Sequence, residues 1–153
     1  MKRMDFNDCI NQNKLFETGI SDKSMALELL KMAEHRESFW LKVNDYADEF
    51  PSLFLEGHYE IIKELCTAIL AFEGWKAINH ECLFSYLKNS EEHNDINLNY
   101  LLELKDLRNS IDYRGTMVSP TLWNDNTVKI RRLIHELKEQ LRTRLTKKYT
   151  ESK

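Results

Sequence analysis

Apolar residues recur at steps of three and four over most of this chain, which is the period of an amphipathic α-helix. With only 4 Gly and 2 Pro in 153 residues, the chain also lacks the many turns that a sandwich or a barrel requires. The sequence therefore predicts an all-α fold, an antiparallel up-and-down bundle of four to five helices. The period is clearest in the last expected helix, whose inward stripe is Trp123, Thr127, Ile130, Ile134, Leu137 and Leu141.

Capping residues and chain breaks divide the pattern into helices. A first helix is expected over about 22–49, ending before Pro51, and a last one over about 120–147, with Ser119 as its N-cap. Between them we expect a helix that ends near Gly74, a short helix over about 79–87, and a fourth that ends at Gly115. The first helix should turn one stripe toward the core, namely Met25, Leu29, Met32, Arg36, Trp40, Val43 and Ala47.

The expected domain organisation is simple. A chain of this length suits one domain, and we assign residues 20–148 to the bundle. Residues 1–19 are mixed and polar, and are expected to form a flank or a short docking helix. Residues 149–153 are expected to form a tail. The helix over the apolar segment 65–72 should be the most buried.

Cysteine usage and the terminus predict a cytoplasmic protein. The cysteines are Cys9, Cys66 and Cys82, an odd count without regular spacing, so we expect no disulfide framework and a buried Cys66. The N-terminus lacks the apolar region of a signal peptide, and no apolar run approaches the ~18 residues of a membrane span. No two histidines have the helical spacing of a metal pair, and no glycine-rich phosphate loop occurs. We therefore expect no metal, no cofactor and no membrane contact.

A polar cluster stands at the end of the fourth expected helix, in the segment LRNSIDYRG. Arg108 falls at the edge of the inward face, and Asp112 lies one turn on, within reach of an ion pair. An ordinary helix terminus explains each residue separately, but it does not explain an Arg-Asn pair at the border of a core. The candidate site residues here are Arg108, Asn109, Asp112, Tyr113 and Arg114.

The last helix is basic over residues 129–148, in a chain whose net charge is −3. A basic stripe can follow phosphates, and Arg131 and Arg132 are candidate contacts. The alternative is a solvated helix face, with cations favoured near a helix C-terminus by the dipole. The two explanations remain open at this point.

Three segments together resemble the HEPN superfamily (higher eukaryote and prokaryote nucleotide-binding domains): ALELLKMAEHRESFW, YEIIKELCTAILAFEGWKAINHECLFSYL and LLELKDLRNSIDYRG. The resemblance covers about residues 23–141. The family signature is an Arg, a polar residue that is often Asn, and then a His. Arg108 and Asn109 match it, while Tyr113 stands where many members carry the His. The resemblance implies a homodimer and contact with RNA or a nucleotide.

The missing histidine changes the expected chemistry. In the metal-independent ribonucleases of the family, the Arg steadies the phosphate and the His handles a proton. A tyrosine, with a reference pKa of about 10, is a poor base at neutral pH. We therefore expect a catalytically degenerate protein that binds RNA, a nucleotide or a partner, with Arg108 and Tyr113 in the former catalytic positions.

Two alternatives remain. One is an active toxin-type, metal-independent endoribonuclease in which His80 supplies the proton chemistry. His80 is distant from Arg108 in the sequence, so only the fold could bring them together. The other is an interaction module that pairs with a nucleotidyltransferase, as some family members do.

Overall fold

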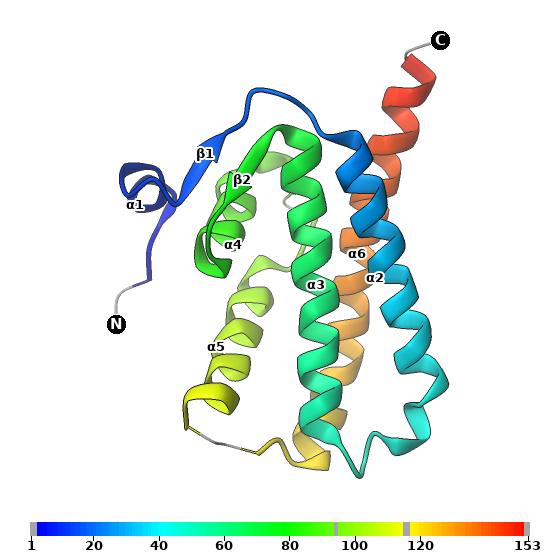
Figure 1. The fold of residues 1–153 in the computed structure, drawn as a ribbon. Helices are drawn as coiled ribbons and strands as arrows, with labels where there is room; N and C mark the ends of the chain where they lie inside the picture. The colour runs from blue at the N-terminus through cyan, green and yellow to red at the C-terminus, as the bar shows by residue number, and fades with distance from the viewer. Residues whose placement is uncertain (1–2, 94, 115–116, 152–153) are drawn as a thin grey trace.

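The computed structural model is an all-α bundle with one small pair of strands (Figure 1). It describes residues 3–93, 95–114 and 117–151, except for the side chains of 112–114 and 147–151. Within these residues two 3-10 turns, η1 (Asn44–Tyr46) and η2 (Glu91–His93), accompany the main elements. The main elements are α1 (Phe6–Asn11), β1 (Leu15–Glu17), α2 (Lys23–Lys42), α3 (Pro51–Glu73), β2 (Trp75–Ala77), α4 (His80–Asn89), α5 (Leu98–Arg114) and α6 (Pro120–Glu151).

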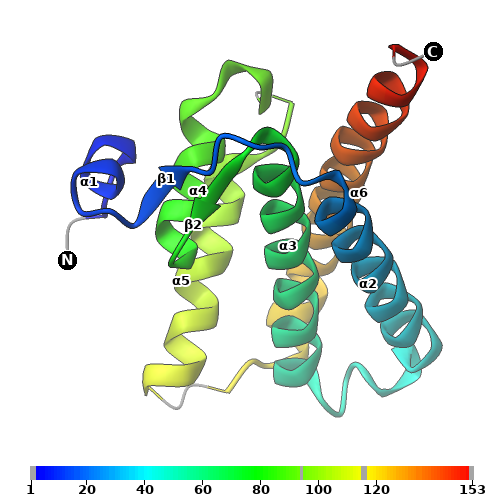
Figure 2. The same ribbon diagram turned by 45° about the horizontal axis from the view of Figure 1, so that its top comes forward.

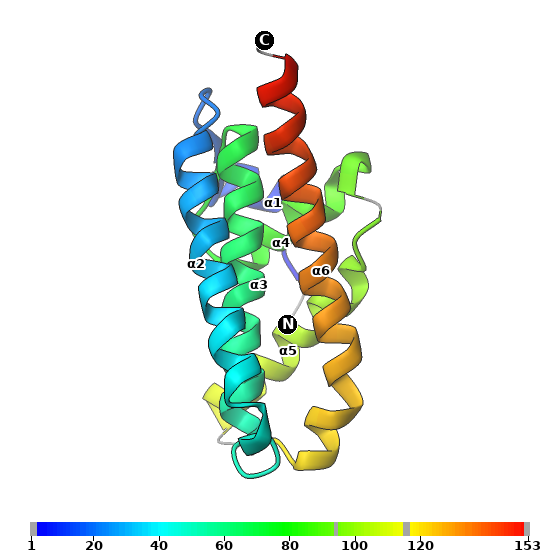
Figure 3. The same ribbon diagram turned by 90° about the vertical axis from the view of Figure 1, so that its right-hand side faces the viewer.

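The four long helices alternate in direction along the chain, which confirms the predicted up-and-down bundle. In Figure 1, α2 and α5 descend while α3 and α6 ascend. α3 is the central helix, because it packs against α2, α6, α4, α5 and β2. Figure 3 shows α2, α3 and α6 as three neighbouring columns, with the C-terminal end of α6 rising above the others.

The most buried helix is α3, as its sequence predicts. Its inner positions are almost inaccessible to solvent, including Ile62, Leu65 and Ile69 at 0% exposure. Burial of apolar surface on this scale is the main favourable contribution to folding. The helix ends at Gly74, whose φ of 80° places it in the left-handed conformation that glycine adopts without a steric penalty.

The inward stripe predicted for α2 is wrong in its first half. The buried residues are Ala26, Leu30 and Ala33, whereas Met25 and Met32 are 44% and 47% exposed. Small alanines on the inner face let α2 approach α3 closely. The helix also ends at Lys42, well short of residue 49, because the chain tightens into η1. α2 has a second stripe of apolar residues, one position away from the buried stripe. The helical period fits both stripes, and the prediction chose the exposed one.

The N-terminal segment is part of the folded structure, and of the two expectations for it, a flank or a short docking helix, the helix α1 fits the second. α1 packs against α4, and β1 pairs antiparallel with β2, with Leu15 opposite Ala77. Figure 2 shows these elements together on one side of the bundle. Leu15 is 1% exposed. The sequence did not predict the strand pair, because three residues are too few to show a period of two.

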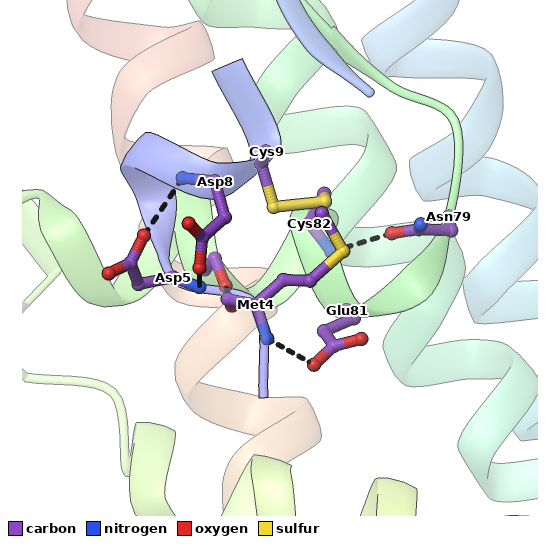
Figure 4. Close-up of a disulfide and its surroundings, with 8 residues drawn as sticks. Met4, Asp5, Asp8, Cys9, Asn79, Glu81 and Cys82 are labelled. Carbon is purple, nitrogen blue, oxygen red and sulfur yellow. Dashed lines mark hydrogen bonds between the residues drawn. A yellow bond between two sulfur atoms is a disulfide. The ribbon is translucent and has the colours of Figure 1, made fainter. Parts of the chain in front are cut away.

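A disulfide joins Cys9 to Cys82, which corrects the expectation of free cysteines (Figure 4). Around it, the backbone N–H of Met4 donates to Glu81 and the Asn79 side chain accepts from the N–H of Cys82. Cys66 remains a buried thiol, as predicted. Sequence spacing could not reveal the pair, because its members are 73 residues apart and meet only through the fold. Disulfides are uncommon in a reducing cytoplasm, so cysteine usage no longer predicts that compartment.

The predicted start and buried stripe of the last helix, α6, are confirmed. Ser119 caps it, since its Oγ accepts from the N–H of Leu122 at 3.0 Å. Its stripe from Trp123 to Leu141 is buried, apart from the half-buried Thr127. The prediction that Gly115 ends α5 lies outside the described residues. Over the part of the chain that the structure describes, no helix is both long and apolar enough to cross a membrane.

Candidate anion-binding site

Arg108 lies against an aromatic ring in the middle of the bundle. It is half-buried on α5, and its Cζ lies 5.6 Å from the centroid of the Tyr59 ring on α3. A guanidinium over an aromatic face is attracted by the negative charge density of the ring. Tyr59 is fully buried, so the ring is a fixed platform. The position of Arg108 at the border of the core therefore has a structural cause.

The same tyrosine contacts His80. The hydroxyl oxygen of Tyr59 lies 3.1 Å from Nδ1 of His80, the first residue of α4. Burial raises the pKa of Tyr59, in spite of the nearby charge of Arg108, so the phenol stays protonated and has a hydrogen to share with Nδ1. When the phenol is the donor, a neutral His80 carries its ring proton on Nε2. Arg108, Tyr59 and His80 thus come together from three helices.

Two lysines add positive charge around this group. Burial lowers the pKa of His80, and the charges of Lys63, Arg108 and Lys105 lower it further, while Glu60 opposes them. Lys63 pairs with Glu60 at 2.9 Å. Lys105 is only 7% exposed, with its Nζ 4.0 Å from Oδ1 of Asp106. We call Arg108, Tyr59, His80, Lys63 and Lys105 the Arg108 cluster.

For the other predicted residues of the LRNSIDYRG segment, the structure describes only part of the side chains. Asn109 is half-buried on α5. The side chains of Asp112, Tyr113 and Arg114 lie outside the described residues, although their backbone continues α5. Tyr59, Lys63 and Lys105 were missed by sequence reasoning. Tyr59 and Lys63 stand one turn apart on α3, which is the only local signal that they share a face.

The basic residues of α6 are largely engaged within the protein. Arg131 donates to Oδ1 of Asn44 at 3.0 Å, and Lys138 pairs with Glu37 on α2. Arg142 lies 3.2 Å from Glu34, and Arg144 pairs with Glu73 on α3. Acidic residues of α2 and α3 therefore neutralise much of the positive charge of α6. Arg132 is exposed, but the stripe as a whole attaches α6 to its neighbours.

The two buried histidines, His58 and His93, have structural environments. His58 donates from Nδ1 to the carbonyl of Phe54 at 2.7 Å and stacks among Trp40, Phe54 and Trp123. His93 is fully buried, with Nε2 3.1 Å from Glu73. Within the described ranges no three side chains of His, Cys, Asp or Glu are grouped so as to hold a metal ion.

Comparisons with known proteins do not extend this description. No family model, curated protein or solved structure matches the chain. The resemblance to the HEPN superfamily therefore rests on the sequence pattern alone, and function has to be argued from the Arg108 cluster.

Proposed function

We propose that this protein is a HEPN-like helical protein that binds a phosphate group of RNA or of a nucleotide at the Arg108 cluster. The observation that carries the proposal is the meeting of Arg108 and His80 on Tyr59, from α5 and α4. A guanidinium offers parallel N–H donors that match phosphate oxygens. Lys63 and Lys105 add charge close to His80, which favours an anion.

The tautomer of His80 favours binding over catalysis. With Tyr59 as the donor to Nδ1 of His80, the ring carries its proton on Nε2 and offers a hydrogen-bond donor there. A phosphate oxygen accepts such a donor, whereas a general base would need an unprotonated nitrogen facing the substrate. This agrees with the expected loss of catalysis where Tyr113 replaces the signature His.

One observation supports the alternative that the protein is an endoribonuclease. The fold does bring His80 near Arg108, which the sequence alone left open. Incubation of RNA with the protein in the presence of a chelator tests it. Cleavage that disappears in both Arg108→Ala and His80→Ala would extend the binding proposal to catalysis, and no cleavage above those variants would reject it.

Binding itself is tested by fluorescence anisotropy with a labelled single-stranded oligoribonucleotide of mixed sequence. Loss of a charged donor to phosphate is expected to weaken binding about tenfold in Arg108→Ala. Affinity should also fall as salt is raised. Arg108→Lys should recover only part of the loss, because it keeps the charge and not the paired donors.

The matched control is Arg36→Ala. Arg36 lies on α2, is paired with Glu64 at 2.6 Å and is also partly exposed, so its loss changes the net charge equally. It should weaken RNA binding by no more than twofold or so. Equal affinities for Arg36→Ala and Arg108→Ala would overturn the proposal, because binding would then follow net charge alone.

A second candidate, partner binding, is favoured by the outer face of α2. Met25, Met32 and Phe39 are spaced by seven residues and are each more than two-fifths exposed. Apolar residues at this spacing suit pairing with another helix. This face would form the homodimer that the HEPN resemblance implies, or contact a nucleotidyltransferase in the interaction-module alternative.

Light scattering on the purified protein tests the homodimer. The expected result is a dimer that becomes a monomer in Met32→Lys and in Phe39→Lys, since a charge at either position would be buried in the interface. Val128→Lys is the control, because Val128 is an exposed apolar residue on α6. A wild-type monomer at micromolar concentrations would rule the homodimer out and leave a different partner for this face.

A further inference from the structure

A cavity of about 680 Å³ lies beside the Arg108 cluster and is not explained by phosphate binding. It is enclosed by α3, β2, the start of α4 and the connection from β1 to α2, which passes over the upper end of α3 in Figure 1. Most of its wall is apolar and includes Leu70, Trp75 and Leu83. Its size and lining are those of a site for a small organic molecule. Arg108 is not among the lining residues.

The lower end of the cavity is cationic. Lys63 on α3 and His80 on α4 both line it, and the charge of Lys63 reaches His80 strongly enough to lower its pKa. Lys63 is half-buried and is paired with Glu60. The one carboxylate in the lining, Asp22, is already engaged, because it accepts from the N–H of Met25 at 2.9 Å. An anionic group is therefore the charge that this end would favour.

The other end of the cavity holds a hydroxyl. The backbone N–H of Asp22 donates to the carbonyl of Ala71 at 2.8 Å, so Ser21 lies near the last turn of α3. Its Oγ is buried, and among the described residues it has no hydrogen-bond partner. A buried hydroxyl without a partner is unfavourable. A polar atom of a ligand would satisfy it.

The two ends are separated by about two turns of α3. Lys63, Thr67 and Ala71 follow one another at steps of four and all line the cavity. With a rise of 1.5 Å per residue, Lys63 and Ala71 are ~12 Å apart along the helix. Along α3 the lining thus presents the cation of Lys63, a mainly apolar stretch of this length, and the Ser21 hydroxyl, which has no hydrogen-bond partner among the described residues.

We propose that this cavity binds a medium-chain organic carboxylate, with its carboxylate at Lys63 and His80, its chain along Leu70 and Leu83, and a terminal polar group at Ser21. An apolar chain removed from water supplies most of the affinity, and the ion pair fixes the direction of the chain. This inference goes beyond phosphate binding, although His80 belongs to both sites.

Calorimetry with decanoate is the first test. Decanoate should bind saturably with one molecule per chain, and decylamine, which has the same chain and the opposite charge, should bind at least about tenfold more weakly. Lys63→Met should weaken decanoate binding by a similar factor. Lys31→Met, which removes an exposed lysine from α2 away from the cavity, should leave it unchanged. Equal binding of decanoate and decylamine would overturn the proposal.

Two further variants locate the ligand. Thr67→Trp places a large side chain in the middle of the wall and should abolish binding of decanoate, provided that circular dichroism shows an intact fold. ω-Hydroxydecanoate should bind more tightly than decanoate to the wild type, and Ser21→Ala should remove that advantage without changing the affinity for decanoate. Undiminished binding in a folded Thr67→Trp protein would place the ligand elsewhere and refute the site. Arg108→Ala should retain decanoate binding, so failure of the phosphate proposal and failure of this one are distinguishable.

Discussion

Gly57 is the residue at which packing overrules intrinsic helix propensity. It lies within α3, where an ideal Cβ would stand only 2.0 Å from Cζ2 and 2.2 Å from Cε2 of Trp40. The indole is held in place by Phe54 and His58, with ring centroids 4.8 and 5.8 Å away. Because Gly57 has no side chain, Trp40 of α2 can pack directly on the backbone of α3. Neither its sequence position nor the helical period indicates this role.

The first prediction concerns Gly57→Ala. In an ordinary helix this change stabilises the protein by up to about 1 kcal/mol. Here we expect a loss of about 1–3 kcal/mol, because the methyl group displaces a packed indole. Urea unfolding measures the difference.

The same substitution in a Trp40→Ala background provides the control. Once the indole is gone, Gly57→Ala should become stabilising, because only the propensity difference of up to about 1 kcal/mol remains. A loss of equal size in both backgrounds would mean that the contact with Trp40 is not the cause.

At the scale of elements, the sequence predicted where the helices lie along the chain better than it predicted which face of each helix is buried. The end of α3 at Gly74 and the start of α6 at Ser119 were placed correctly, and so was the buried stripe of α6. α2 carries two adjacent stripes of comparable apolarity, and periodicity alone cannot tell which of them meets α3. The alanines Ala26 and Ala33, which allow close approach, mark the buried one. The candidate site was predicted only in part for a related reason, since Tyr59, on α3, reaches Arg108 only through a contact between helices.

The disulfide between Cys9 and Cys82 ties α1 to α4, and its removal gives a second prediction. Closing a loop of 73 residues restricts the unfolded chain by about 4 kcal/mol in the chain-entropy account. A thiol reductant should therefore lower the unfolding temperature of the wild type by several degrees. The reductant should have no such effect on Cys9→Ser, because this variant lacks the disulfide and already unfolds at the lower temperature.

Cys66→Ala is the matched control, because Cys66 is the buried free thiol. This variant should keep the response to the reductant. A thiol assay on the unfolded, unreduced protein should find one reactive group in the wild type. Three reactive groups would show that the disulfide does not form, and would remove the explanation for how α1 is held.

At the scale of the whole molecule, buried ionisable groups make the fold sensitive to acid. Burial lowers the pKa of His58 from 6.5, and Arg131 adds to this effect, while the bond to the Phe54 carbonyl and the charge of Glu37 oppose it. His80 has a lowered pKa as well. For Glu73, burial acts to raise the pKa, but the bond to His93 and the charge of Arg144 outweigh it and lower the pKa from 4.5. The three groups are spread over α3 and α4, so acidification affects the centre of the bundle.

The last prediction is the direction of this pH dependence. A histidine whose pKa is lower in the folded state is protonated more readily when unfolded, so the free energy of unfolding is complete above about pH 6.5 and falls as the pH drops below that value. For His58 the slope is at most about 1.4 kcal/mol per pH unit. The stabilisation from ionised Glu73 is lost in turn below about pH 4.5, as the pH falls toward its lowered folded pKa.

Urea unfolding at a series of pH values between about 7.5 and 5 measures the slope. His80→Gln should reduce it, because one of the two histidines with a lowered pKa is removed. His35→Gln should not, because His35 is exposed on α2. If the free energy of unfolding were constant over this range, or rose on acidification, then the two histidines would be solvated or paired with an acid in the folded protein. The hydrogen bond from Tyr59 to Nδ1 of His80 would then fail too, because a protonated ring carries a proton on both nitrogens and cannot accept one.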